Sequence, residues 1–273
     1  MLIKKMLYQI LIASSIIMAI NGGAMSTALA QNTSQLEKIL KSKELRVCIW
    51  PDYYSITYRN PKTRQLSGID ISISQDFAKE LGVKLSYIDH NFAQLIDSLV
   101  NDKCDVAMHA IGITPSRQEK LQFTQPYLRS DMYAITTKQN NNINQWSDLD
   151  QTGRVIAVAA GTVMEPVLLQ RFKKAKILSV KTPLTREQEV ESGRADAFMS
   201  DFPYSQRMID LTDWAKVIPP NSVYFQTDYA YAINKGDDSL LKRLNQYITE
   251  IKKNGKLLQF AKQNKLDSIV ILN

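Results

Sequence analysis

The chain has few residues of the kinds that build metal centres. Of its 273 residues, only two are histidine and two are cysteine. The four positions, His90, His109, Cys48 and Cys104, form no short-spaced cluster. Because transition-metal sites need several imidazole or thiolate ligands, the sequence predicts no metal site, and we expect no cofactor.

No apolar run is long enough to span a membrane. The run that follows Lys4 and Lys5 is broken at residues 21–23, short of the roughly 20 apolar residues that a spanning helix needs. Its basic start, apolar centre and small-residue end at Ala28-Leu29-Ala30 are typical of a secretory signal peptide. We therefore expect a leader over residues 1–30, cleavage after Ala30, and a periplasmic mature chain without stable membrane insertion.

Charge of one sign does not dominate either. The chain has 34 basic and 27 acidic residues and a formal net charge of +7, which falls to about +5 once Lys4 and Lys5 leave with the leader. Basic and acidic residues alternate along the chain instead of forming a basic stripe. This pattern is typical of a solvated surface and argues against a nucleic-acid partner.

The cysteine pair has two interpretations. An even number of cysteines in an oxidising compartment favours a Cys48–Cys104 disulfide. Both residues also lie at or near the start of predicted buried strands, where a thiol can serve as a small hydrophobic side chain.

Hydrophobic periodicity divides the mature chain into two series of strands and helices. After a first helix over 34–43, the first series has strands at 45–49, 83–88 and 105–111 and helices at 69–81 and 92–99, with a loop at 51–54. The second series has strands at 155–159, 177–180 and 195–199 and helices at 163–173 and 186–192. Alternating strands and helices predict parallel sheets covered by helices on both faces.

Two extended runs, at 132–137 and 228–233, predict strands that cross between the two units. Helices expected at 240–254 and 256–263 return to the first unit, which is therefore discontinuous. We predict a first lobe of residues 31–135 and 229–273 and a second lobe of residues 136–228.

Several short motifs occur in a fixed order along the chain. They are Ser67-Gly68-Ile69-Asp70, Cys104-Asp105-Val106-Ala107-Met108, Gly112-Ile113-Thr114-Pro115-Ser116-Arg117, Phe123-Thr124-Gln125-Pro126-Tyr127, Ala160-Gly161-Thr162, Gly193-Arg194-Ala195-Asp196-Ala197, Asp201 and Asn254-Gly255-Lys256-Leu257. Together they resemble the family 3 extracellular solute-binding proteins. The resemblance implies a periplasmic-binding-protein-like (type II) α/β fold, with two lobes joined by two crossing hinge strands. It also implies a monomer that captures an amino acid and delivers it to an ABC transporter permease.

The resemblance also implies a binding site. An amino acid is a zwitterion, so a selective site needs one fixed cation and one fixed anion. By similarity, Arg117 binds the ligand carboxylate through bidentate, charge-assisted hydrogen bonds, and Asp201 binds the ammonium group from the opposite lobe. Backbone amides near Gly112 and Thr162 assist at helix N-termini. Two structural alternatives stay open: pairing of Arg117 with Glu119, and a helix-starting role for Asp201.

Aromatic side chains are expected to shape the rest of the site. By similarity to the family, Tyr53 and Phe92 surround the ligand, and Trp50 replaces an acidic residue that some relatives use for cationic amino acids. Ala110 and Val163 complete the predicted lining. Departures from the family pattern at Gly112, His109, Ala159 and Met164 predict a bulkier and more apolar pocket.

An enzyme on the same scaffold is the main alternative. Four segments also resemble periplasmic cyclohexadienyl dehydratases: Leu45-Arg46-Val47, Tyr58-Arg59-Asn60-Pro61, Ser67-Gly68-Ile69-Asp70 and Lys173-Lys174-Ala175-Lys176-Ile177-Leu178. Such an enzyme needs a general acid, but the expected position holds Met164, with Glu165 one place further on. We therefore predict no catalytic residue and no enzyme activity. A third possibility is a binding protein that serves a sensor or a periplasmic dehydrogenase.

Overall fold

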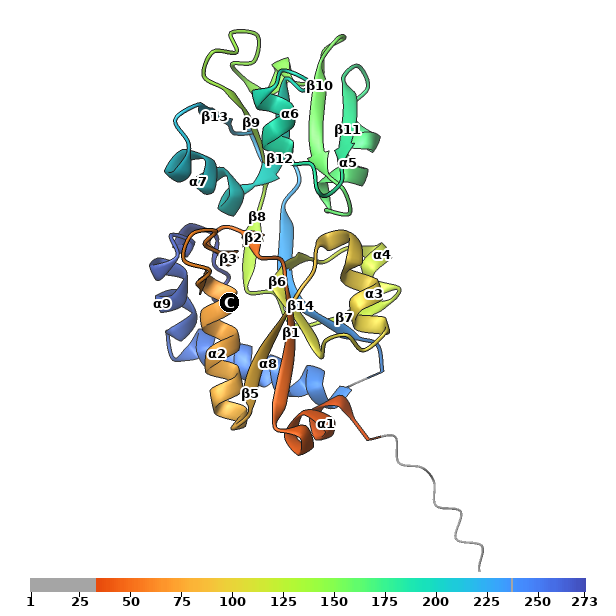
Figure 1. Cartoon of the computed structure of the whole chain (residues 1–273), viewed down its shortest axis with the longest axis vertical. Coiled ribbons are helices and arrows are strands. Elements are labelled where there is room, and N and C mark those ends of the chain that lie inside the picture. Colours follow the sequence, from red (N-terminus) through yellow and green to blue (C-terminus); the bar gives the residue numbers. More distant parts are fainter. Residues whose placement is uncertain (1–32, 237) are drawn as a thin grey trace, which may run out of the picture. The chain divides into compact units, whose positions relative to one another are not determined.

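The structure is a computed structural model that describes residues 33–236 and 238–273. The predicted signal peptide, residues 1–30, lies outside this range. Within the described residues, no helix has the length and apolar character needed to cross a membrane. The described chain forms two main β-sheets with helices packed on them (Figure 1).

The first sheet has the strand order β5-β1-β6-β14-β7, with β8 also paired to β14. Strands β1, β5 and β6 are parallel, with β5 at the edge of the sheet, and β14 runs antiparallel to β6. The three parallel strands confirm the predicted first series. The bounds are β1 (Glu44–Ile49), β5 (Lys84–Asp89), β6 (Val106–Gly112), β7 (Leu121–Phe123), β8 (Leu128–Ser130) and β14 (Thr227–Asn234).

A small three-stranded sheet corrects the predicted loop at 51–54. It consists of β2 (Asp52–Tyr53), β3 (Thr57–Arg59) and β4 (Leu66–Ser67). Pro51 lies just before β2, so its missing N–H removes no hydrogen bond from the ladder. The sheet holds Tyr53 in a fixed, buried position.

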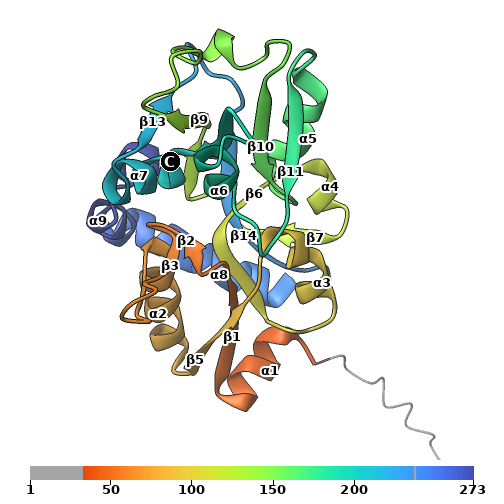
Figure 2. The same ribbon diagram turned by 45° about the horizontal axis from the view of Figure 1, so that its top comes forward.

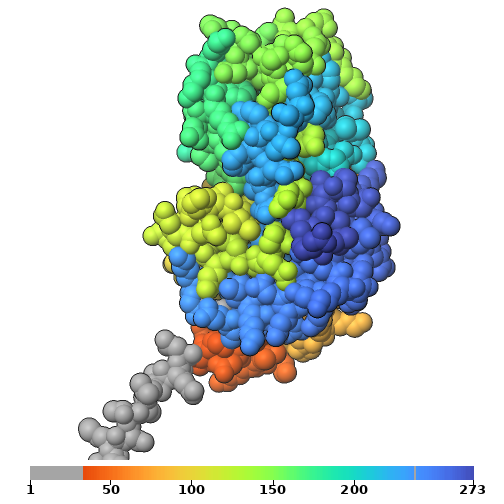
Figure 3. Space-filling model, turned by 180° about the vertical axis from the view of Figure 1, so that it is seen from behind, coloured from red at the N-terminus to blue at the C-terminus, as the bar shows by residue number. Residues whose placement is uncertain are grey.

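Helices from both ends of the chain cover the first sheet. Helix α2 (Ile69–Leu81) buries Ile69, Ile73 and Phe77, and it ends at Gly82, whose φ of 66° suits glycine. C-terminal α8 contacts α1, and α9 contacts α2, so orange and blue segments lie together in Figure 3. The remaining bounds are α1 (Gln35–Ser42), η1 (Phe92–Gln94), α3 (Leu95–Val100), α4 (Pro115–Gln118), α8 (Asp238–Lys253), α9 (Lys256–Gln263) and η3 (Asp267–Ile269).

The second sheet has the order β11-β10-β12-β9-β13 (Figure 1), and its strands β9, β10, β11 and β13 are labelled in the upper part of Figure 2. Strands β10, β11 and β12 are parallel and confirm the predicted second series. The bounds are β9 (Met132–Thr137), β10 (Val155–Ala159), β11 (Lys176–Val180), β12 (Ala197–Asp201), β13 (Ala215–Ile218), η2 (Trp146–Asp148), α5 (Met164–Arg171), α6 (Arg186–Glu191) and α7 (Phe202–Leu211).

The prediction that residues 132–137 and 228–233 cross between the units is wrong. Strand β14, which contains 228–233, pairs with β6, β7 and β8 and so belongs to the first sheet. Strand β9 pairs with β12 and β13 along its length and so belongs to the second sheet, and the predicted lobe boundary after residue 135 falls inside it. The chain passes between the sheets at Ser130 and Asp131, beside Thr227. The Asp131 carboxylate accepts hydrogen bonds from the backbone N–H groups of Tyr224 (2.8 Å) and Phe225 (2.7 Å), which ties the two connecting segments together.

Cys48 and Cys104 form a disulfide, with their Cα atoms 5.7 Å apart. Both side chains are buried. The disulfide links Cys48 on β1 to Cys104 in the segment just before β6, the strand that pairs with β1 in the first sheet.

Candidate functional site

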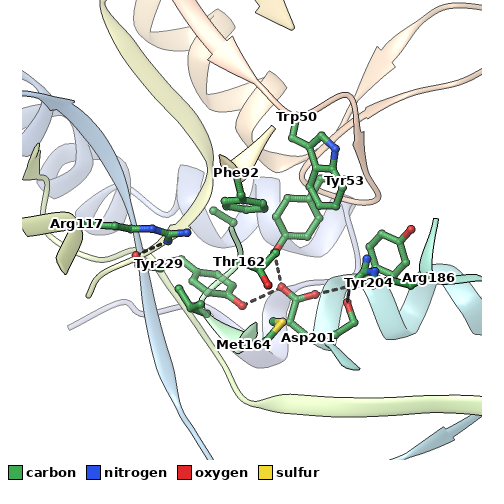
Figure 4. A pocket seen from close by; sticks show the side chains of 14 residues that line it. Trp50, Tyr53, Phe92, Arg117, Thr162, Met164, Arg186, Asp201, Tyr204 and Tyr229 are labelled. Carbon is green, nitrogen blue, oxygen red and sulfur yellow. Dashed lines mark hydrogen bonds between the residues drawn. The ribbon is translucent and has the colours of Figure 1, made fainter. Parts of the chain in front are cut away.

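One cavity brings together all nine residues that the sequence predicts for the site (Figure 4). These are Trp50, Tyr53, Phe92, Ala110, Gly112, Arg117, Thr162, Val163 and Asp201. Their common location is a finding about the fold, whereas their role in binding remains a prediction. Met164, which was expected to make the pocket more apolar, also lines the cavity, together with four described residues that were not predicted: Arg186, Ser200, Tyr204 and Tyr229.

Strand ends of both sheets position these side chains. Gly112 ends β6, and Asp201 ends β12. Ligand sites in α/β sheets lie at the carboxyl ends of parallel strands. Gly112 is also needed for close packing, because a Cβ atom there would lie 2.7 Å from Val163 Cγ1 and 2.8 Å from Thr227 Cγ2.

Arg117 is a buried cation without a carboxylate partner among the described residues. The residue is 7% exposed. Nη1 donates to the carbonyl oxygen of Gly112 (2.8 Å), and Nη2 donates to that of Gly161 (2.9 Å). Burial lowers the pKa of the guanidinium to about 10, so it stays protonated at neutral pH. The predicted alternative, pairing with Glu119, is therefore not found.

Asp201 is a buried carboxylate held by hydrogen-bond donors from two parts of the fold. It is 2% exposed. Oδ2 accepts from the hydroxyl of Tyr53 and from that of Tyr229 (2.8 Å), while Oδ1 accepts from the backbone N–H of Tyr204 (3.2 Å). The hydrogen bond from the Tyr204 N–H caps the N-terminus of α7, so Asp201 does have the helix-starting role that was given as an alternative. Burial raises the pKa of Asp201, although these donors oppose the shift.

Aromatic rings form one wall of the cavity. The Trp50 ring centroid lies 5.3 Å from that of Tyr53, 5.4 Å from that of Phe92 and 6.3 Å from that of Tyr204. The Trp50 and Tyr204 rings are nearly parallel, at 11°. The Arg117 guanidinium lies 5.5 Å from the Phe92 centroid, close enough for a cation–π contact.

The two histidines lie in contact next to this wall. His90 Nε2 and His109 Nε2 are 2.8 Å apart, and the His109 ring packs against Phe92 at 4.7 Å between centroids. Burial lowers the pKa of His90 to about 4 and that of His109 well below its usual value. Both imidazoles are therefore neutral at pH 7.

Glu165 does not line the cavity, although Met164 does. Its carboxylate accepts hydrogen bonds from the backbone N–H of Gly161 (2.8 Å) and from the hydroxyl of Ser179. The Glu165 carboxylate thus stabilises the loop between β10 and α5. The neighbouring residue, Met164, lines the cavity in its place.

Sequence reasoning missed Arg186, Tyr204 and Tyr229 as site residues. Arg186 was interpreted as the start of a helix, which it is, but helical spacing does not reveal that its side chain turns toward the cavity. The helix α7 that carries Tyr204 was foreseen only through the alternative that Asp201 starts a helix, without bounds for that helix. Asp201 followed by Pro203 is a typical helix start and was the available signal.

Comparison with known proteins identifies relatives of two kinds, a dehydratase and an amino-acid-binding protein. The chain is 28% identical over 235 residues to cyclohexadienyl dehydratase of Pseudomonas aeruginosa, covering 86% of this chain and 87% of that one. It is 27% identical over 193 residues to an L-cystine-binding protein of Escherichia coli, covering 71% and 72%.

A solved structure is also similar to this chain over most of its length. The crystal structure of an ancestral amino acid-binding protein, described as a precursor of cyclohexadienyl dehydratase, matches with a TM-score of 0.77 and 31% identity. The match covers 85% of this chain and 99% of that one. It confirms the predicted two-lobed α/β fold of the periplasmic-binding-protein type.

The family model for bacterial extracellular solute-binding proteins, family 3, matches residues 45–265. This range includes both sheets and every predicted site residue. The chain therefore belongs to the bacterial extracellular solute-binding proteins of family 3.

Proposed function

We propose that this protein binds an amino acid in the cavity and delivers it to the permease of an ABC transporter. The observation that carries the proposal is the buried Arg117 guanidinium, which has hydrogen bonds only to carbonyl oxygens in the described part of the chain. Burying a charge without a counter-ion is costly, and a ligand carboxylate would supply the missing anion. Asp201, in the same cavity, is the matching anion for an ammonium group.

We also propose that the mature chain is a monomer exported to the periplasm after cleavage at Ala30. The L-cystine-binding protein and the ancestral amino acid-binding protein among the relatives support an amino acid as the ligand. Residues of both sheets line the cavity, which is why we expect a ligand there to favour the closed arrangement of two lobes, as hinge-bending binding proteins do.

The protein is proposed to bind its ligand without transforming it. The dehydratase alternative has one specific observation in its favour, the similarity to the Pseudomonas aeruginosa enzyme. A dehydratase must protonate a leaving hydroxide. Glu165 is engaged outside the cavity, and Met164 occupies the lining position beside it.

A thermal-shift screen tests the proposal. The refolded, ligand-stripped protein is heated with each of the common amino acids, prephenate or arogenate. A ligand that binds only the folded state must raise the melting temperature. We expect one amino acid or a small group of them to do so, and calorimetry to give the affinity.

Arg117→Gln removes the charge but keeps a hydrogen-bond donor, and it is expected to weaken binding by about tenfold or more. The matched control is Arg129→Gln, because Arg129 is exposed and pairs with Asp228 outside the cavity. Equal affinity of wild type and Arg117→Gln would contradict the proposal. Turnover of prephenate by the wild type would establish the dehydratase instead.

A further inference from the structure

Arg186 is a second buried cation in the cavity, and the proposed amino-acid site does not use it. It is 5% exposed and lines the same cavity as Arg117 and Asp201. Nη1 donates to the carbonyl oxygen of Met199 (2.9 Å) and to the hydroxyl of Ser200 (3.2 Å). Within residues 33–236 and 238–273, no carboxylate forms an ion pair with it.

Aromatic packing fixes the position of this guanidinium. Its Cζ atom lies 4.3 Å from the ring centroid of Tyr204 and 5.2 Å from that of Phe198. With Nη1 bound to the end of β12, the guanidinium cannot turn away to meet a distant partner. Figure 4 shows it beside Tyr204, close to Asp201.

The carboxylates near Arg186 form no ion pair with it, although its charge acts on them: against the effect of burial, it helps to lower the pKa of Glu187 and limits the rise in the pKa of Asp201. Glu187 accepts the hydrogen bond of the Tyr204 hydroxyl, and Asp52 pairs with Arg207 at 2.9 Å. Asp201 accepts its three hydrogen bonds from Tyr53, Tyr229 and the backbone N–H of Tyr204. Of the residues that the structure describes, two cations, Arg117 and Arg186, and one anion, Asp201, line the cavity.

A neutral zwitterion leaves Arg186 without a direct partner. Its carboxylate meets Arg117 and its ammonium group meets Asp201, whereas Arg186, whose charge acts on Glu187 only through space, has hydrogen bonds to a carbonyl oxygen and a hydroxyl alone among the described residues. A ligand with a second carboxylate would give Arg186 a charge-assisted hydrogen bond inside the cavity, so the site is expected to discriminate in favour of that ligand.

We propose that the ligand carries two carboxylate groups, one bound by Arg117 and the other by Arg186. This inference rests on the proposed function and names its ligand class: a small dicarboxylate, which Asp201 further restricts to an acidic amino acid. Arg186 also lines a second, adjoining hollow that shares Trp50, Phe92, Thr162 and Tyr204 with the cavity. The side-chain carboxylate therefore binds at the junction of the two hollows.

Calorimetry on the wild type is the first test. L-glutamate and L-aspartate are compared with L-glutamine, L-asparagine and L-arginine, which present the same backbone groups without a second anion. We expect one of the acidic amino acids to bind at least about tenfold more tightly than its own amide. Tighter binding of the amide or of L-arginine would overturn the inference. This test uses the wild type alone, so it does not depend on whether a variant folds.

Arg186→Met is the second test, because methionine keeps apolar contact with Tyr204 while removing the charge. It should weaken binding of the acidic amino acid by about tenfold or more, with little effect on the affinity for its amide. The matched control is Arg171→Met, which removes an arginine that packs on Tyr224 and Phe225 outside the cavity. Unchanged affinity in Arg186→Met would contradict the inference.

Succinate and glutarate, which lack the ammonium group, distinguish the two sources of dicarboxylate. Weak binding of both, together with loss of glutamate or aspartate binding in Asp201→Asn, supports an acidic amino acid. Strong binding that Asp201→Asn leaves unchanged supports a dicarboxylate without an amine. If a neutral amino acid binds through Arg117 but not Arg186, only this inference fails; if nothing binds, the proposed function fails.

Discussion

The two histidines carry the clearest pH dependence in the molecule. Burial lowers the pKa of His90 from 6.5 to about 4, and that of His109 is also lowered. Between about pH 4 and pH 6.5, His90 therefore binds a proton in the unfolded chain but not in the folded chain. The free energy of unfolding therefore falls as the pH falls from about 6.5 to 4, by about 3 kcal/mol for His90 alone.

Urea unfolding from pH 7 to pH 4 measures this effect. Asp70 acts in the opposite direction, since burial raises its pKa to about 7 and its contribution to stability is lost as the pH rises. The comparison must therefore be made between wild type and the double variant His90→Gln, His109→Gln. We expect a flatter loss of stability toward acid in the variant. Parallel profiles for the two proteins would show that the histidines do not cause the wild-type slope.

Single residues also show where sequence reasoning reaches its limit. Arg117 and Asp201 were predicted because the family motifs fix their positions, and the fold brings both to one cavity. Arg186 was not, because its contacts with Met199 and Ser200 join residues 13 and 14 positions apart in sequence. Tyr229 was placed in an extended run, but which face its side chain occupies depends on pairing across β6 and β8.

Elements with a strong local signal were predicted best. The helix over residues 69–81 matches its prediction because Ile69, Ile73 and Phe77 repeat at helical spacing and Gly82 ends the helix. Strand β9 was predicted as a strand but assigned to a crossing segment, since an apolar run does not reveal its partners. Its neighbours β12 and β13 come from sequence positions more than 60 residues away.

The disulfide stabilises the first sheet by restricting the unfolded chain. Cys48 and Cys104 are 56 positions apart, so the bond closes a long loop. Replacing both with alanine is expected to lower the free energy of unfolding by about 2 to 4 kcal/mol. Because β1 and β6 pair without it, the variant should still fold and bind ligand.

Equilibrium unfolding with and without reductant checks this expectation. Reductant should lower the stability of the wild type toward that of the Cys48→Ala, Cys104→Ala variant and leave the variant unchanged. Equal stability of the oxidised wild type and the variant would refute a stabilising role.

The two sheets are coupled by contacts as well as by the connecting segments. Asp201, at the end of β12 in the second sheet, accepts hydrogen bonds from Tyr53 and Tyr229 on strands β2 and β14. Arg117 reaches the carbonyl oxygen of Gly161, which precedes α5. These groups are buried, so their hydrogen bonds contribute more to coupling than exposed ion pairs such as Lys265–Asp210 do.

This coupling predicts that the whole described chain unfolds in one transition. Three tryptophans report on it, with Trp50 beside β2 and with Trp146 and Trp214 among the elements of the second sheet. The variant Trp146→Phe, Trp214→Phe leaves Trp50 as the probe of the first sheet, and Trp50→Phe leaves the other two. Urea midpoints from fluorescence should agree with the midpoint from circular dichroism within each variant. A fluorescence midpoint that departs from circular dichroism in either variant would mean that the two sheets unfold separately, and that the bonds of Asp201 and Arg117 are too weak to join them before a ligand binds.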